Sequence, residues 1–165
     1  MDSARTADPN WSRRLLFAGI VIVVVLGGGL IASATIPRWW AQRIGDQVDG
    51  SIVAGTLIGL FYGFVFTALP LLVLAAVFRW RRTPRAIAVA VGFAVILAIP
   101  NLMTLGIVLG TGNAAHAGER ILDVEAPAFR GASLVGAVIA LAMAGFVFYL
   151  IVSRERARRR TADLR

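Results

Sequence analysis

The sequence predicts an all-α integral membrane protein, a four-helix bundle with both termini in the cytoplasm. Hydrophobic residues make up 58% of the 165 residues, whereas soluble domains contain about 45–50% apolar residues. The excess lies in four long apolar runs, and each run is long enough to cross a bilayer as a helix. The four expected membrane helices, within a transmembrane domain over residues 15–152, cover residues 15–36, 52–78, 86–110 and 132–152.

The second run, residues 52–78, is the central helix of the expected bundle. It contains no charged residue, and it exceeds the length needed to cross a hydrocarbon core of about 30 Å. Small residues at four-residue spacing lie on one helix face and allow a second backbone to approach closely. In the second and fourth runs these faces serve either packing inside the bundle or docking to another membrane subunit. The residues concerned are Gly55, Gly59, Gly63, Gly136, Ala140 and Ala144.

Residues 1–14 form a polar tail ahead of the first run. The sequence from Ser12 to Phe17 is similar to a twin-arginine export signal, so cleavage after Ala34 is the alternative to a retained helix. Residues 15–36 are long for the apolar part of a signal peptide and strongly hydrophobic throughout. We therefore favour a retained membrane helix.

Residues 37–51 are expected to connect the first two membrane helices. Trp40, Ile44 and Val48 recur every four residues, which fits a short amphipathic helix in the membrane interface. A polar connector with a tryptophan anchor fits equally well. Tryptophans beside apolar runs are typical of anchors at the membrane interface; these are Trp11, Trp39, Trp40 and Trp80.

A basic turn over residues 79–85 joins the second and third membrane helices. Thr83 is expected to cap the third helix, and Pro84 suits its first position. Because the turn is short, the two helices should be antiparallel neighbours.

The longest loop is expected between the third and fourth helices, over residues 111–131. Its single histidine, His116, stands near three acidic residues, but a lone histidine with acids on a loop is expected to be solvated rather than to hold a metal. Its apolar residues are expected to lie on the membrane or to touch a partner. The acidic residues are Glu119, Asp123 and Glu125. The apolar residues are Ile121, Leu122, Val124 and Phe129.

The orientation follows from the basic residues, all seventeen of which are arginine. Three lie in the N-terminal tail, four in the basic turn and six in the C-terminal tail over residues 153–165, whereas the other two loops hold two each. The positive-inside rule therefore places both termini and the basic turn in the cytoplasm of a bacterial inner membrane. The net charge of +8 thus reflects topology and does not indicate nucleic-acid binding.

The sequence offers no candidate residues for catalysis or cofactor binding. It has no cysteine and one histidine, and no ionisable side chain lies inside the four runs. Proton relays, ion pathways and membrane enzymes depend on such groups at membrane depth. We therefore expect a protein that is not an enzyme, with no cofactor and no metal.

Few polar side chains remain at membrane depth. Tyr62 and Asn101 lie at nearly the same distance from the basic turn, so we expect them to approach each other, with Thr67 or Thr104 nearby. The helices should bend at two prolines, which are Pro70 and Pro100. The polar side chains around Tyr62 and Asn101 form either a small polar pocket or gate, or an interhelical hydrogen bond that fixes helix packing. We favour the hydrogen bond.

The span pattern, the arginine-only flanks and the uncharged, glycine-rich second run resemble small four-span actinobacterial membrane proteins described as permease-like. Among these is the accessory subunit of mycobacterial Mce-type lipid importers. The resemblance implies a non-catalytic subunit that packs against a permease and aids the assembly or regulation of lipid uptake.

We therefore predict a non-catalytic accessory subunit of an inner-membrane complex, with membrane lipids and a larger permease or ATPase-linked complex as partners. The alternative is a small transporter or channel for an uncharged or lipidic solute. It would work as a homo-oligomer and use the Tyr62/Asn101 level, because four helices rarely enclose a path alone.

Overall fold

A computed structural model describes residues 9–80 and 83–162, which form five helices and no strand. Four helices are long: α1 (Pro9–Val48), α2 (Ile52–Trp80), α3 (Pro84–Leu109) and α5 (Phe129–Ala162). The short helix α4 (Asn113–Glu125) lies between α3 and α5. Each long helix contains a segment apolar and long enough to cross a membrane. The all-α prediction and its four apolar helices are confirmed, and they are typical of a multi-pass membrane protein.

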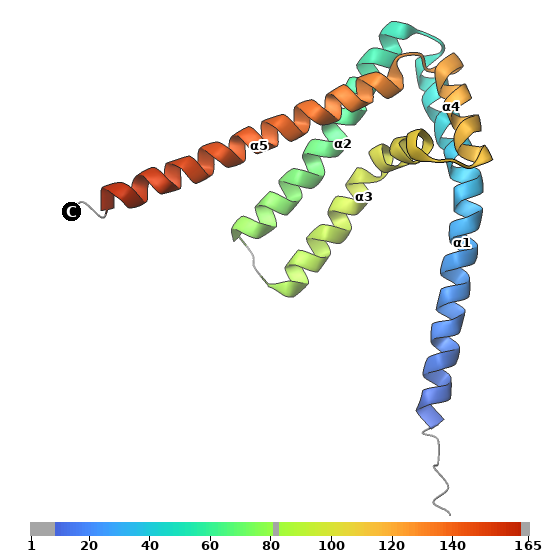
Figure 1. The fold of residues 1–165 in the computed structure, drawn as a ribbon, viewed down its shortest axis with the longest axis horizontal. Helices are drawn as coiled ribbons and strands as arrows, with labels where there is room; N and C mark the ends of the chain where they lie inside the picture. The colour runs from blue at the N-terminus through green and yellow to red at the C-terminus, as the bar shows by residue number, and fades with distance from the viewer. Residues whose placement is uncertain (1–8, 81–82, 163–165) are drawn as a thin grey trace, which may run out of the picture.

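The four long helices diverge from one end of the molecule (Figure 1). We call this end the cap; it comprises residues 37–48 of α1, the helix α4 and the adjoining ends of α2, α3 and α5. Helix α2 packs along both α5 and α3, whereas α1 packs chiefly against α4. The first half of α1 and the last turns of α5 stand apart from the other helices (Figure 1). The helices therefore meet at the cap and separate toward the other end.

The first helix is longer than the sequence predicts. It continues through Pro37 to Val48, so the connector expected over residues 37–51 is helical for most of its length. A proline removes one backbone hydrogen bond from a helix, but here the turns after it are held by burial in the cap. The apolar face of this segment, expected to lie in a membrane interface, is instead buried against residues of its own chain in the cap core. Trp40, expected as an interface anchor, is only 8% exposed.

The loop expected over residues 111–131 contains the helix α4. Ala114, Gly118 and Leu122 follow one another at four-residue spacing and form its buried face. The spacing is typical of an amphipathic helix. Two of the three residues are alanine and glycine, which carry little hydrophobicity, so the pattern is weak in the sequence. Gly118 allows close packing on α1, because a Cβ at this position would lie 3.0 Å from the Pro37 carbonyl oxygen.

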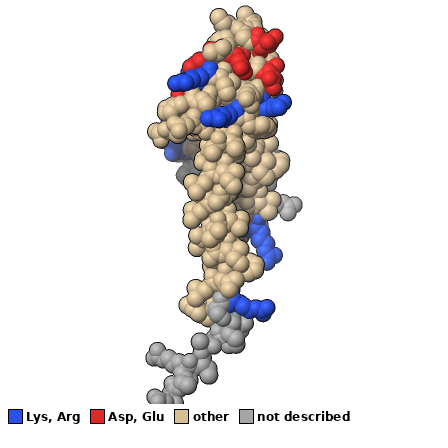
Figure 2. Space-filling model, turned by 90° about the vertical axis from the view of Figure 1, so that its right-hand side faces the viewer, with Lys and Arg blue, Asp and Glu red and all other residues tan. Residues whose placement is uncertain are grey.

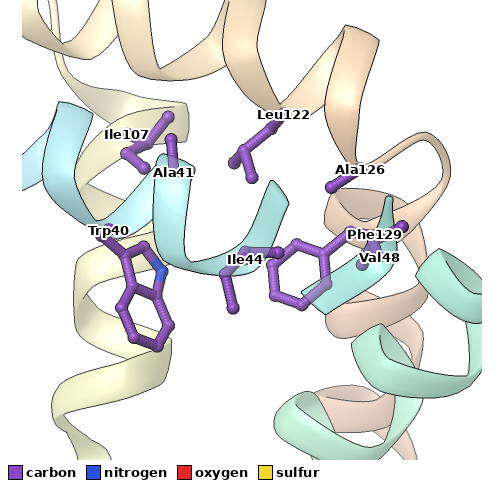
Figure 3. Close-up of a cluster of buried hydrophobic side chains, with 8 residues drawn as sticks. All are labelled: Trp40, Ala41, Ile44, Val48, Ile107, Leu122, Ala126 and Phe129. Carbon is purple, nitrogen blue, oxygen red and sulfur yellow. The ribbon is translucent and has the colours of Figure 1, made fainter. Parts of the chain in front are cut away.

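The hydrophobic core lies in the cap (Figure 3). Phe129 is fully buried and Leu122 is 1% exposed, which corrects the expectation that both lie on the membrane or touch a partner. The Phe129 ring points toward Ile44 of α1, and Val48 lies on its other side (Figure 3). The core thus joins α1, α3, α4 and α5. Its members are Trp40, Ala41, Ile44, Val48, Ile107, Leu122, Ala126 and Phe129.

The turn between α1 and α2 ties three helices together at the cap. Between α1 and α2, Asp49 and Gly50 adopt positive φ angles of 50° and 69°, a conformation that glycine and aspartate tolerate best. The Gly50 N–H donates to the Glu125 carbonyl oxygen at 2.8 Å. The start of α2 is therefore attached to the end of α4.

The helix α3 begins as the sequence predicts. The Thr83 hydroxyl accepts a hydrogen bond from the Ala86 N–H at 3.3 Å, and Pro84 occupies the first helical position. Both α2 and α3 continue through their internal prolines, Pro70 and Pro100. The last turns of α3 run at an angle to the rest of the helix (Figure 1).

We predict that Phe129→Ala lowers the free energy of unfolding by about 3–5 kcal/mol, because it leaves a cavity in the cap core. The matched control is Phe146→Ala in the same helix, since Phe146 is 62% exposed and should leave stability almost unchanged. Thermal unfolding of both purified variants in one detergent measures the difference. Equal melting temperatures for the two variants would contradict a core centred on Phe129.

Candidate functional site

The glycines of α2 face α5 inside the chain. A Cβ at Gly59 would lie 2.5 Å from the Phe129 carbonyl oxygen and 2.9 Å from the Ala132 Cβ. At Gly55 and Gly63 a Cβ would collide with the carbonyl oxygens of Pro127 and Ser133. Only glycine permits this approach of two backbones. We call this contact between α2 and α5 the glycine seam.

Helix α5 contributes small residues to the same seam. A Cβ at Gly136 would collide with the Leu60 carbonyl oxygen. Ala140 is 2% exposed and Ala144 is partly buried. Of the two uses open for these faces, packing inside the protein is the one that the structure displays. Docking to another subunit would require a different surface.

The polar side chains at membrane depth pair with neighbouring helices. The Asn101 Nδ2 donates to the Thr67 Oγ1 at 2.9 Å and to the Gly63 carbonyl oxygen at 3.2 Å, which joins α3 to α2. The Asn101 Oδ1 is buried and has no hydrogen-bond partner.

Tyr62 turns away from this pair toward α1. Its hydroxyl donates to the Gln47 Oε1 at 3.2 Å, and its ring centroid lies 5.9 Å from that of Trp40 and 6.0 Å from that of Phe129. The structure shows no hydrogen bond between the Tyr62 and Asn101 side chains, which were expected to approach each other. Asn101 instead reaches the carbonyl of the residue after Tyr62, because the tyrosine ring is held in the cap.

Thr104 links α3 to α1. The Trp40 Nε1 donates to the Thr104 Oγ1 at 3.0 Å, and this hydroxyl donates to the Pro100 carbonyl oxygen at 3.0 Å. Both side chains are buried. A buried indole N–H needs such a partner, so this bond fixes the second half of α1 on α3.

Arg130 organises the acidic residues of the cap. Its guanidinium donates to the Glu119 carboxylate at 3.0 Å and also to that of Asp123. The His116 Nδ1 lies 3.4 Å from Glu119. On the face shown in Figure 2, acidic and basic side chains gather at the cap, and the surface directly below the cap is uncharged. Within residues 9–80 and 83–162, no three His, Cys, Asp or Glu side chains are grouped so as to hold a metal ion.

The expected interface tryptophans have different environments. Trp11 is 64% exposed and Trp39 is 50% exposed, as anchors at an interface would be. The Trp80 side chain lies outside the part of the chain that the structure describes, as do residues 1–8, 81–82 and 163–165.

Helices α2, α3 and α5 enclose a groove with a volume of about 400 Å³. Its polar groups include those of Asn101, Thr67 and Ser133, and Arg130 lies at its cap end. Asn101 and Thr67 could be predicted from the sequence, whereas Ser133 could not, since a serine at a helix start carries no distinctive signal.

Comparison with known proteins assigns no family to this chain. No protein-family model, curated protein or solved structure matches it.

We predict that Gly63→Ala destabilises the protein by about 1–3 kcal/mol, the usual cost of overpacking a close contact. The added methyl group would meet the Ser133 backbone, whose carbonyl carbon lies 2.7 Å from the Cβ position. The control is Gly145→Ala in α5, where nothing lies within 4 Å. Melting temperatures in detergent should fall for the first variant and hold or rise for the second; a stable Gly63→Ala protein would rule out the glycine seam.

Proposed function

We propose that this chain is a non-catalytic accessory subunit of an inner-membrane complex, such as a lipid transporter. We propose further that it docks to a larger membrane partner through residues 13–36 of α1, which we call the arm. The observation that carries this proposal is that the arm is an apolar, glycine-containing helix that packs against almost nothing in its own chain.

The exposure of the arm is uniform around the helix. The large apolar side chains from Leu15 to Ile31 are between 48% and 73% exposed. Gly19, Gly27, Gly28 and Gly29 have nothing within 4 Å of a Cβ position. Each glycine in a helix interior costs about 1 kcal/mol relative to alanine. Close packing of the glycines against the backbone of a partner helix would offset this cost, since small residues promote such packing between membrane helices.

The far end of α1 holds the arm in a defined position. The Trp40 indole is bonded to Thr104, and Ala41 and Ile44 are fully buried in the cap core. The arm is therefore fixed at one end and presented to the bilayer along the rest of its length. This is the form expected of a docking helix.

The polar groups at depth support a non-catalytic role. Asn101, Thr67 and Thr104 bond to neighbouring helices or to helix backbone. No charged side chain lies within the four apolar runs. The resemblance of the span pattern and arginine-only flanks to accessory subunits of Mce-type importers agrees with this role.

A second candidate function is an oligomeric transporter of an uncharged or lipidic solute. The groove between α2, α3 and α5 favours it, because Asn101 and Thr67 place uncharged polar groups on a largely apolar wall. In that case Asn101→Ala would abolish flux and leave the protein folded.

We predict that the tagged protein, solubilised in a gentle detergent, co-purifies with a larger permease or ATPase-linked complex and that Gly28→Leu disrupts this association. The added side chain would bulge from the arm and block close approach of a partner helix. The control is Gly92→Leu in α3, the same change at another position with nothing within 4 Å; it should retain the partner. Mass spectrometry of the co-purified proteins measures how much of the partner complex each of the two variants retains.

Recovery of this chain alone, as a monomer or a homo-oligomer, would overturn the accessory role. Retention of the complex by Gly28→Leu would exclude the arm as the docking surface. Both variants should keep or raise the melting temperature of the unaltered protein, because no atom lies within 4 Å of either Cβ position and leucine favours a helix more than glycine does.

The arginine distribution supports an orientation with the cap outside the cytoplasm and both termini inside. The chain has no cysteine, so a single introduced cysteine is the only thiol of the protein that a labelling reagent can modify. We predict that Val124→Cys, at a side chain 75% exposed in the cap, reacts with a membrane-impermeant maleimide in spheroplasts. Arg156→Cys should react only after lysis. The reverse pattern would invert the topology.

A further inference from the structure

The groove between α2, α3 and α5 is built like a small-molecule site. Its volume of about 400 Å³ lies within the range of about 300–1,000 Å³ typical of ligand pockets. Most of the wall is apolar and includes Leu102 and Leu105 of α3 and Leu134 and Ala137 of α5. Such a wall accommodates a hydrocarbon chain.

Two polar side chains of the groove wall have hydrogen-bonding capacity that the protein itself does not use. Asn101 lines the groove, and its Oδ1 is buried without a partner. A buried acceptor left unpaired is unfavourable. The Thr67 hydroxyl accepts a hydrogen bond from Asn101, so its own proton is left to donate elsewhere. A ligand hydroxyl both donates and accepts, and it therefore complements this pair.

The charges at the cap end of the groove favour an uncharged ligand. Arg130 lies there, but its guanidinium is engaged by the carboxylates of Glu119 and Asp123. One positive and two negative charges leave this cluster with a net charge of −1. It therefore does not attract a carboxylate or phosphate headgroup, and the remaining polar wall is neutral.

We propose that this groove binds an uncharged, hydroxyl-bearing, single-chain lipid such as a long-chain alcohol. The hydroxyl lies between Asn101 and Thr67, and the alkyl chain lies against the leucines of α3 and α5. The proposal does not depend on the accessory role of the chain, because it concerns a surface distant from the arm.

The test uses the full-length protein in detergent and a photoactivatable hexadecanol that carries a diazirine on its chain. Labelled peptides should come from α3 and α5. Unlabelled hexadecanol should compete about tenfold better than its methyl ether or hexadecanoate, because the ether lacks the donor and the acid is charged. Asn101→Leu should abolish the preference for the alcohol over the ether.

Two further variants separate loss of binding from loss of folding. Ala137→Trp fills the groove without removing a polar group and should reduce labelling about tenfold. Val138→Trp changes the next residue, which is 54% exposed and lies outside the groove, and it should label normally.

Equal competition by the alcohol and the ether, or labelling of Ala137→Trp at the level of Val138→Trp, would overturn the proposal. Stronger competition by hexadecanoate would overturn its charge argument and identify an anion site.

Discussion

The burial of Phe129 and its neighbours in the cap is the interaction on which the rest of the structure depends. All four long helices meet there (Figure 1). Within a bilayer, apolar side chains gain little by leaving lipid for protein, so helices do not associate through the hydrophobic effect. The 40 residues of α1 extend about 60 Å, roughly twice the hydrocarbon thickness. The cap can therefore lie where water is present and where burial of Phe129, Ile44 and Leu122 is strongly favourable.

Below the cap, a different kind of contact holds the helices. Helices α2 and α5 meet along the glycine seam, where backbone lies against backbone. Asn101 adds a polar contact from α3 to α2. These three helices form a packed unit with a groove between them. The arm of α1 has no comparable neighbour, so the same membrane domain presents one self-contained part and one exposed helix. This division separates the surface proposed for a partner from the groove proposed for a lipid.

Sequence reasoning was accurate where the signal is local or depends only on composition. The four apolar runs, the Thr83 cap and the Pro84 start require no knowledge of distant residues. It failed at Pro37 and at residues 111–131. A proline after an apolar run is usually read as an end, but burial of Trp40 and Ile44 keeps α1 helical beyond it. The buried face of α4 consists of Ala114, Gly118 and Leu122. Two of these residues have low hydrophobicity, so the amphipathic pattern is weak in the sequence, although small residues allow α4 to pack closely on α1.

By itself, the sequence determined that this protein is helical, that four segments are long and apolar enough to span a membrane, and that the second and fourth carry faces of small residues. These properties follow from side-chain hydrophobicity and helical spacing, which are local. Only the tertiary structure decided that these faces meet each other, that Trp40 faces Thr104, that Tyr62 turns from Asn101 and that the arm remains uncovered. A helix face of small residues determines how closely another helix can approach it. Which helix packs there is decided by the packing of the whole chain.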